Sequence, residues 1–142
     1  MRIVILGAGR LGARLANVLV SEGQVIDIVD QDEAKFKSLS DHPNLRHVHG
    51  DIFNDEVMAT VFTTPPDVFI VVTGSDNINL MVAQAIKRQY PIPRVLVRVF
   101  DPTLAEVYNN LGMETVCPTN YAVAEMHKMI QQAESPSPRP LP

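Results

Sequence analysis

Three glycines near the N-terminus have the spacing of a phosphate-binding turn. Gly7, Gly9 and Gly12 follow the apolar run RIVIL (2–6) and open a segment with helical periodicity. In such a turn the first glycine allows a tight bend, the second lets the backbone approach a pyrophosphate, and the third permits close helix–strand packing. The N–H groups of residues 10–12 would face the phosphates at the positive end of a helix dipole. We therefore predict a nucleotide-binding turn; the alternative is a plain turn.

An aspartate at the end of the second apolar run supports this prediction. Asp30 follows VIDIV (25–29) and lies eighteen residues after Gly12. A carboxylate at this position accepts hydrogen bonds from the ribose hydroxyls of an adenosine and repels a 2′-phosphate. The next residues, QDE (31–33), supply no arginine for such a phosphate. We therefore expect NAD or an adenine mononucleotide rather than NADP, and we include Gln31 in the candidate site.

Two further apolar runs end in polar residues. Asp51 follows RHVHG (46–50), where it would either cap the next helix or accept a hydrogen bond from the adenine amine. After VFIVV (68–72), three small residues would flank the phosphates or a second ribose, or else cap a helix: Thr73, Gly74 and Ser75. Helix capping is the only role expected of Asp76.

Arg98 lies between two valines in the run RVLVRV (94–99). A guanidinium on an apolar strand needs an anion, so we expect a ligand phosphate or an acidic side chain beside it. The remaining reactive side chains suggest no catalytic centre. His47 and His49 have no third partner at metal spacing and are expected to be solvated, and Cys117 is expected to be a packed thiol.

The order of the elements explains how these residues would meet. Strands are predicted at 2–6, 25–29, 46–50, 68–72, 94–99 and about 114–117. Helices are predicted at 12–22, 31–40, 54–62, 76–90, within 100–112, and from about 119 to 133. Three strands are apolar at nearly every position, as in a parallel sheet covered on both faces. The fold class is therefore a Rossmann-like, doubly wound α/β domain over 1–133, followed by a disordered proline-rich tail at 134–142.

Composition excludes several other classes of protein. The chain has 142 residues, of which 46% are hydrophobic and 20% charged, and a net charge of -4. Its twelve Lys and Arg residues are scattered, which argues against nucleic acid as a partner. With strand-sized apolar runs, one cysteine and no leader sequence, we expect a cytoplasmic protein. A dehydrogenase would need a substrate domain after residue 133, so we expect no enzyme; the alternative is an NAD-dependent oxidoreductase or its dinucleotide-binding half.

Six segments form a recognisable set: VILGAGRLGARLA, VIDIVDQDEAKF, HGDIFNDEVM, FIVVTGSDNINLMVAQAIK, VRVFDPTLAEVYNNLG and VCPTNYAVAEM. Together they resemble the RCK domain, also called the KTN or TrkA N-terminal domain, over about residues 1–133. The resemblance implies a regulator that binds NAD(H), AMP, ADP or ATP and gates a potassium channel or transporter at the inner face of the membrane. By position, it assigns the phosphates to Gly7, Gly9, Arg10, Leu11 and Gly12, the ribose to Asp30, the adenine edge to Asp51 and Ile52, and the distal end to Thr73, Gly74 and Arg98.

The resemblance also implies an assembly. Family members form dimers in which the last helix crosses to the partner, and the dimers build rings. Here the predicted last helix carries two apolar stripes: Ala122, Met126, Met129 and Ala133, and Val123, Met126, His127 and Ile130. We therefore expect a homodimer through residues 121–133; the alternative is a helix folded back on its own sheet.

Two departures from the family pattern bear on partners and metals. Many relatives continue into a C-terminal domain, so this chain would be either truncated or a subunit that pairs with a longer RCK subunit. Some relatives carry an acidic residue just after the proline that corresponds to Pro118, where it helps to hold a cation. Thr119 stands at that position, so no metal is expected.

Overall fold

The structure, a computed structural model, describes residues 1–132 and 140–141 of the chain. The tail predicted at 134–142 therefore lies outside the described residues, apart from 140 and 141. Ala133, the last residue of the helix predicted from about 119 to 133, lies outside them as well.

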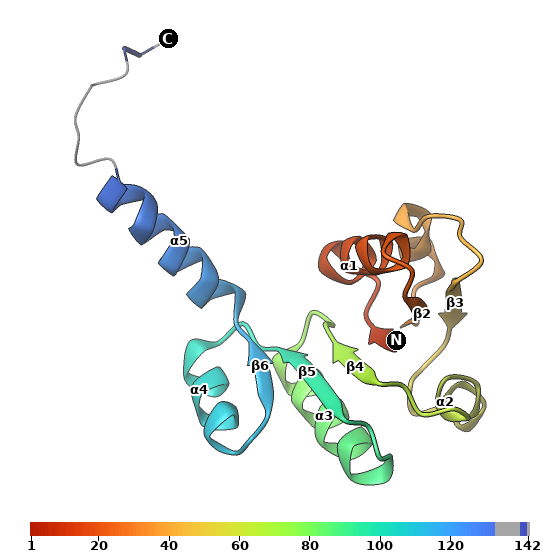
Figure 1. Cartoon of the computed structure of the whole chain (residues 1–142). Helices are drawn as coiled ribbons and strands as arrows, with labels where there is room; N and C mark the ends of the chain where they lie inside the picture. Colours follow the sequence, from red (N-terminus) through yellow and green to blue (C-terminus); the bar gives the residue numbers. More distant parts are fainter. Residues whose placement is uncertain (133–139, 142) are drawn as a thin grey trace.

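Six parallel strands form one sheet in the described part of the chain (Figure 1). They are β1 (Arg2–Leu6), β2 (Val25–Asp30), β3 (Leu45–His49), β4 (Val68–Val71), β5 (Arg94–Arg98) and β6 (Glu114–Val116). Their order is β3-β2-β1-β4-β5-β6, so the direction of winding reverses between β1 and β4. The predicted doubly wound fold is confirmed, and ligands in such sheets bind at this reversal point.

The helices alternate with the strands as predicted. They are α1 (Arg10–Ser21), α2 (Asp55–Phe62), α3 (Asp76–Gln89), α4 (Pro102–Asn110) and α5 (Pro118–Gln132). The helix predicted at 31–40 is instead a six-residue 3-10 helix, η1 (Glu33–Ser38). It begins where the Asp32 carboxylate accepts from the Ala34 N–H at 3.1 Å, and it ends at Leu39, whose backbone is already extended. Only Phe36 anchors η1 in the core, which leaves no apolar stripe to support a longer helix.

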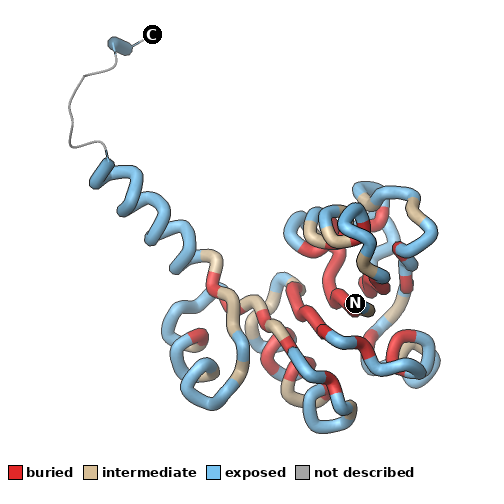
Figure 2. Tube along the Cα trace, in the orientation of Figure 1, coloured by how far each residue is buried: buried red, intermediate tan, exposed pale blue. Residues whose placement is uncertain are grey.

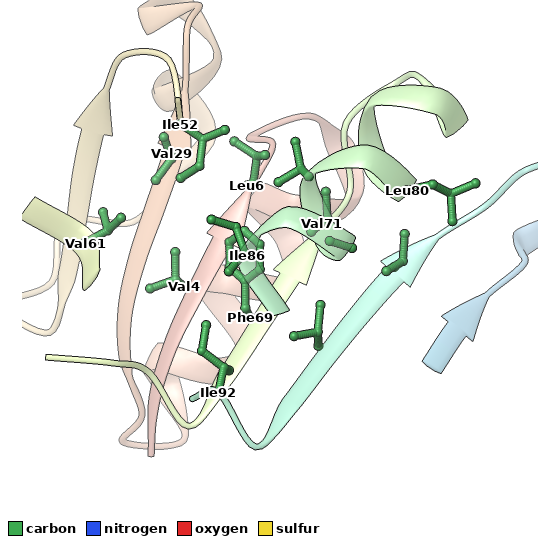
Figure 3. Packing of buried hydrophobic residues seen from close by; sticks show 14 of the residues in the cluster. Val4, Leu6, Val29, Ile52, Val61, Phe69, Val71, Leu80, Ile86 and Ile92 are labelled. Carbon is green, nitrogen blue, oxygen red and sulfur yellow. The ribbon is translucent and has the colours of Figure 1, made fainter. Parts of the chain in front are cut away.

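Side chains alternate between the two faces of the sheet and make two cores. Val4, Phe69 and Ile86 belong to the core on the side of α2 and α3, part of which Figure 3 shows. Ile5 and Ile28 point to the other face, where they pack with residues of α1 and η1. All five side chains are fully buried. This burial on both faces explains why the strands read as continuous apolar runs.

One buried charge lies toward the amino ends of the strands. Asp27 is 2% exposed and forms ion pairs with Arg2 and Arg46. The same two guanidinium groups donate to carbonyls of the last turn of α2, Arg2 to Val61 at 2.8 Å and Arg46 to Thr60 at 3.1 Å. Asp27 therefore fixes α2 against the sheet, away from the carboxyl ends where the strands meet the candidate site.

The last helix, α5, extends away from the sheet (Figures 1 and 2). None of its residues is buried, and Tyr121, Val123, Met126, Met129 and Ile130 are each 59–68% exposed. The alternative of a helix folded back on its own sheet is therefore wrong for this chain. Within the residues described, no helix combines the length and the hydropathy needed to cross a membrane.

Candidate functional site

A cleft of about 490 Å3 opens at the carboxyl ends of the strands. Strand register explains why its residues meet: Leu6 of β1 pairs with Val29 of β2 and Val71 of β4, so the residues that follow reach one edge together. Most of the predicted site residues line the cleft: Gly7, Gly9, Asp30, Gln31, Asp51, Ile52, Thr73, Gly74 and Arg98. Arg10, Leu11, Gly12 and Ser75 do not line it.

The glycine turn has the geometry that its spacing predicts. Gly7 has a φ of +111°, and a Cβ atom there would lie 2.8 Å from the Val72 carbonyl oxygen. A Cβ on Gly12 would lie 1.8 Å from the Gly7 carbonyl oxygen, so α1 packs on the turn only without a side chain. At Gly9 nothing lies within 4 Å of the Cβ position, and no side chain caps α1 there. The turn thus leaves open space at the N-terminus of α1, where an anion is favoured.

Asp30 is held against this turn. Its Oδ2 accepts from the Ala8 N–H and its Oδ1 from the Asp32 N–H, each at 2.8 Å. The residue is 9% exposed, and the Lys35 ammonium lies 3.7 Å from Oδ2. Because a carboxylate has about four acceptor positions, both oxygens can still accept from a ligand. Sequence reasoning missed Lys35, which lines the cleft from η1.

Asp51 does not cap the following helix. Its Oδ1 accepts from the Phe53 N–H at 2.9 Å in a turn, and the cap of α2 is Asn54, which accepts from Glu56 N–H at 2.9 Å. The capping alternative is therefore wrong, because the chain makes one more turn before α2 begins. The carboxylate of Asp51 remains at the edge of the cleft.

The start of α3 also differs from the prediction. Ser75 is the N-cap, with an extended backbone and an Oγ that accepts from the Ile78 N–H at 3.3 Å. Asp76 is already the first helical residue, so the prediction that it caps α3 is wrong. Its carboxylate instead accepts from the N–H groups of Phe100 and Asp101, at 2.8 and 3.0 Å. Asp76 thereby ties α3 to the loop after β5.

A buried asparagine that the sequence reasoning missed holds the loop before α3. Asn79 is completely buried; its Oδ1 accepts from the Thr73 N–H, and its Nδ2 donates to the carbonyls of Thr73 and Arg98, each at 3.0 Å. The only signal in the sequence is an amide among the apolar residues of α3. This side chain joins the carboxyl ends of β4 and β5 at the cleft.

Apolar residues recur at helical spacing along α3, at Ile78, Met81, Val82, Ala85 and Ile86. This repeat does not coincide with the buried face of the helix. The structure buries Asn79, Leu80, Val82, Ala83 and Ile86 instead. Ile78 and Met81 are 46% and 52% exposed and line the cleft, where they supply an apolar wall beside its polar groups.

Arg98 has no acidic partner within ion-pair distance among the described residues. Its Nη2 donates to the carbonyls of Val72 and Thr73 at 2.7 and 3.0 Å, while its buried Nε has no partner. The guanidinium carbon lies 4.5 Å from the centre of the Phe100 ring. Burial lowers the pKa of Arg98, and the charge of Asp76 partly opposes this effect. Arginine stays charged even so, and a cation supported only by carbonyls and a ring suits an anionic ligand.

The other reactive side chains do not line the cleft. His47 and His49 are exposed on the edge strand β3, as predicted, and His49 Nε2 lies 2.9 Å from the Gln31 carbonyl. Cys117 is buried, and its thiol donates to the Phe100 carbonyl at 3.6 Å, so it is the packed thiol that was predicted. In the described parts of the chain, no group of three or more His, Cys, Asp or Glu is placed to hold a metal ion.

Curated relatives align with most of this chain. The Trk system potassium uptake protein TrkA of Streptomyces coelicolor is 31% identical over 126 residues, 89% of this chain and 56% of the relative. The TrkA homolog of Methanothermobacter thermautotrophicus is 28% identical over 131 residues, 92% of this chain and 60% of the relative. The chain thus spans little more than half the length of these relatives.

Solved structures share the fold. The Shewanella denitrificans Kef C-terminal domain in AMP-bound form has a TM-score of 0.78 at 16% identity, covering 96% of this chain and 84% of that one. GsuK bound to ADP has a TM-score of 0.77 at 19% identity, covering 92% and 34%. The profile of the TrkA-N domain matches residues 3–119. Since this match covers most of the chain, including the glycine turn and all but the first residue of the six strands, the chain belongs to the TrkA-N domain family.

Proposed function

We propose that this chain binds an adenine nucleotide or NAD(H) in the cleft. The observation that carries the proposal is the hydrogen bond from the Ala8 N–H to Asp30, which unites the two halves of an adenosine phosphate site. The turn offers N–H groups to phosphates, and the carboxylate offers acceptors to ribose hydroxyls. A cleft of about 490 Å3 is within the usual size of a site for a small ligand.

The ligand would lie across the ends of the strands. Its phosphates would accept hydrogen bonds from the backbone N–H groups of Arg10, Leu11 and Gly12, in the first turn of α1. The adenine would lie by Asp51 and Ile52, against the apolar wall of Ile78 and Met81. Further phosphates, or a nicotinamide ribose, would reach Thr73, Gly74 and Arg98. Ser75 would act only through the loop that it caps.

The role that this binding would serve is regulation of potassium transport. Two relatives carry the name Trk system potassium uptake protein, and structures with the same fold include the GsuK channel and a Kef domain with AMP. We infer a regulatory domain that binds a nucleotide without consuming it and gates a channel or transporter. It would associate with the inner face of the membrane through that partner.

The exposed helix α5 would carry the assembly of this regulator. Its apolar side chains include Met126, Met129 and Ile130, each more than half exposed. Monomers seldom leave a continuous apolar patch of this kind in water. We propose that α5 crosses to a second copy of the chain, and that such dimers build rings with further copies or with a longer RCK subunit.

Calorimetric titration of the chain with AMP, ADP, ATP, NAD+ and NADH tests the nucleotide site. At least one of these ligands should bind, and Asp30→Ala should weaken its binding tenfold or more because hydrogen bonds to a carboxylate are lost. The matched control is Asp41→Ala, an exposed aspartate outside the cleft, which should change the affinity less than twofold. Failure of all five ligands to bind would refute the proposal.

A second candidate function is the dinucleotide-binding part of an NAD-dependent oxidoreductase. It is favoured by the fold of the Bordetella bronchiseptica enzyme WbmH in complex with NAD+, with a TM-score of 0.57 at 23% identity. That likeness covers 68% of this chain and 38% of the enzyme. Steady oxidation of NADH by the chain, followed by its absorbance with a panel of carbonyl compounds, would favour this candidate over regulation.

A further inference from the structure

Arg98 brings a positive charge to the wall of the cleft, and its surroundings leave that charge unpaired. Its Nη2 donates to the Val72 carbonyl at 2.7 Å and to the Thr73 carbonyl at 3.0 Å. Among the described residues, no carboxylate lies within ion-pair distance of the guanidinium, and its buried Nε has no hydrogen-bond partner. Carbonyl groups orient a guanidinium but carry no negative charge to cancel its own. The charge of Arg98 is therefore available to an anion.

Asp76 is the acidic residue whose charge acts on Arg98, yet its carboxylate is held elsewhere. Its Oδ1 accepts from the Phe100 N–H at 2.8 Å and its Oδ2 from the Asp101 N–H at 3.0 Å. Both donors belong to the loop after β5, so they keep the carboxylate on that loop. Asp76 thus lessens the cost of burying Arg98 without forming an ion pair that a ligand would have to break.

Phe100 supports the guanidinium from the same loop. Arg98 Cζ lies 4.5 Å from the centre of the Phe100 ring, which is within the range of a cation–π contact. The backbone of Phe100 is fixed on both sides, because Asp76 binds its N–H and its carbonyl accepts from Thr119 Oγ1 at 3.1 Å. The donors of a guanidinium lie in its plane, so a ring over its face does not block them. Phe100 therefore holds Arg98 in place and leaves its N–H groups free for a ligand.

The order of the strands decides which part of a nucleotide can reach Arg98. Asp51 follows β3, Asp30 ends β2 and the glycine turn follows β1, so adenine, ribose and first phosphate would succeed one another along this edge. Arg98 ends β5 and reaches back to the carbonyls that follow β4, the strand next to β1. Gly74 lines the cleft there, and nothing lies within 4 Å of the position of a Cβ on it. The space beside Arg98 thus falls to whatever follows the first phosphate.

We propose that this end of the cleft binds the free terminal phosphate of an adenosine di- or triphosphate, with Arg98 as its receptor and Phe100 as the residue that positions Arg98. The inference rests on the proposed function and narrows its ligands. AMP has no second phosphate, and NAD(H) has an uncharged ribose beyond its pyrophosphate. Asp30 and the glycine turn would contact the part that all these ligands share, so Arg98 is the residue that distinguishes them by terminal charge.

Calorimetric titration without divalent cations tests the inference, because the phosphates then keep their full charge. The tighter of ADP and ATP should bind to the unmodified chain at least tenfold more tightly than AMP and NAD+ do. Arg98→Gln should weaken that ligand at least tenfold and AMP less than threefold. The control Arg88→Gln removes an exposed arginine of α3 that does not line the cleft, and it should change neither affinity more than twofold.

Two variants of Phe100 test its positioning role. Phe100→Leu keeps an apolar side chain but removes the ring, so it should weaken the tighter of ADP and ATP threefold or more and AMP less than twofold. Phe100→Tyr keeps the ring and should bind both ligands like the unmodified chain. Because Phe100 is 40% exposed, neither change should unfold the domain. Damage to the fold would weaken both ligands alike, whereas a misplaced Arg98 weakens only the ligand with the further phosphate.

The outcomes separate this inference from the proposed function. If AMP or NAD+ binds within tenfold of the tighter of ADP and ATP, or if Arg98→Gln weakens AMP equally, the terminal-phosphate subsite is refuted while the nucleotide site stands. If Phe100→Leu leaves the ratio of the two affinities unchanged, or if Phe100→Tyr lowers it as Phe100→Leu does, the role of Phe100 is refuted. If AMP, ADP, ATP, NAD+ and NADH all fail to bind, the proposed function and this inference fail together.

Discussion

The side-chain amide of Asn79 pairs with both backbone groups of Thr73: it accepts from the N–H and donates to the carbonyl, each at 3.0 Å. The same amide donates to the Arg98 carbonyl. One fully buried side chain on α3 therefore sets the separation of two strand ends, and with it the shape of the cleft. This arrangement makes the stability of the fold and the geometry of the candidate site depend on the same residue.

Asn79→Ala should accordingly lower both stability and nucleotide affinity. The substitution leaves buried N–H and carbonyl groups of the backbone without partners, at a cost of at least about 2 kcal/mol in the free energy of unfolding. Asn77→Ala is the matched control, because Asn77 is an exposed residue of the same helix. Its effect should stay within about 0.5 kcal/mol by urea unfolding. Equal stabilities for the two variants would contradict the role given to Asn79.

Replacement by alanine should destabilise the fold at Gly12 but not at Gly9. A Cβ at Gly12 meets the Gly7 carbonyl oxygen at 1.8 Å, so Gly12→Ala should cost about 2–3 kcal/mol or more in the free energy of unfolding. Gly9 has an ordinary φ of -69° and open space at its Cβ position, so Gly9→Ala should fold normally.

The same pair separates folding from binding. Gly9→Ala should still weaken nucleotide binding tenfold or more, since the methyl group fills the space where the phosphates would approach the backbone. Thermal unfolding and calorimetry of the two variants check this. A Gly9→Ala variant with unchanged affinity would place the phosphates elsewhere.

The glycine turn was predictable because it depends on local geometry. Gly7 and Gly12 act through their own backbone and its nearest turn, and Asp30 follows from the end of an adjacent parallel strand. These relationships span short stretches of sequence, in which residue type and spacing carry the information. The order of strands and helices was predictable for the same reason.

Other parts of the site depend on contacts between distant segments. Lys35, Ile78 and Met81 line the cleft from helices, and Asn79 of α3 is buried behind it. Within a helix, periodicity alone does not tell a core residue from a cleft residue. The start of α3 was misplaced by one residue, because Ser75 and Asp76 are both good helix caps. That single step sends the Asp76 carboxylate to a different loop.

Two ion-paired carboxylates, Asp27 and Glu114, should differ in their contribution to stability. Asp27 is nearly buried between Arg2 and Arg46, so Asp27→Ala leaves two cations facing each other. We expect a loss of about 2–4 kcal/mol in the free energy of unfolding, less than for a fully buried pair because Arg46 is half exposed. Glu114→Ala removes the exposed partner of Arg94 and should cause only a small loss. Urea unfolding of both variants compares them directly.

The pH dependence of the exposed pair has a defined sign. The hydrogen bond from Arg94 lowers the pKa of Glu114 in the folded chain. The pair therefore stabilises the fold at pH values above the unfolded pKa of Glu114, and this contribution is lost as the pH falls through the folded pKa. The difference in stability between the unmodified chain and Glu114→Gln should shrink on acidification. A difference that grows at low pH would contradict this assignment.

The last prediction concerns α5 and the proposed dimer. Met126 and Ile130 lie one turn apart and are 64% and 68% exposed. If a second copy covers them, changing both to Asp places two charges in an apolar interface and should dissociate the dimer.

The control changes Lys128 and Gln132 to Asp at the same spacing on the opposite side of the helix. Light scattering at micromolar concentration should give a dimeric or larger mass for the unmodified chain and the control, and a monomeric mass for Met126→Asp/Ile130→Asp. Circular dichroism checks that α5 stays helical in the double variant. Because Met126 and Ile130 are exposed within one chain, their replacement should leave the fold intact. A monomeric mass for the unmodified chain would refute assembly through α5, and so would a double variant that keeps the larger mass.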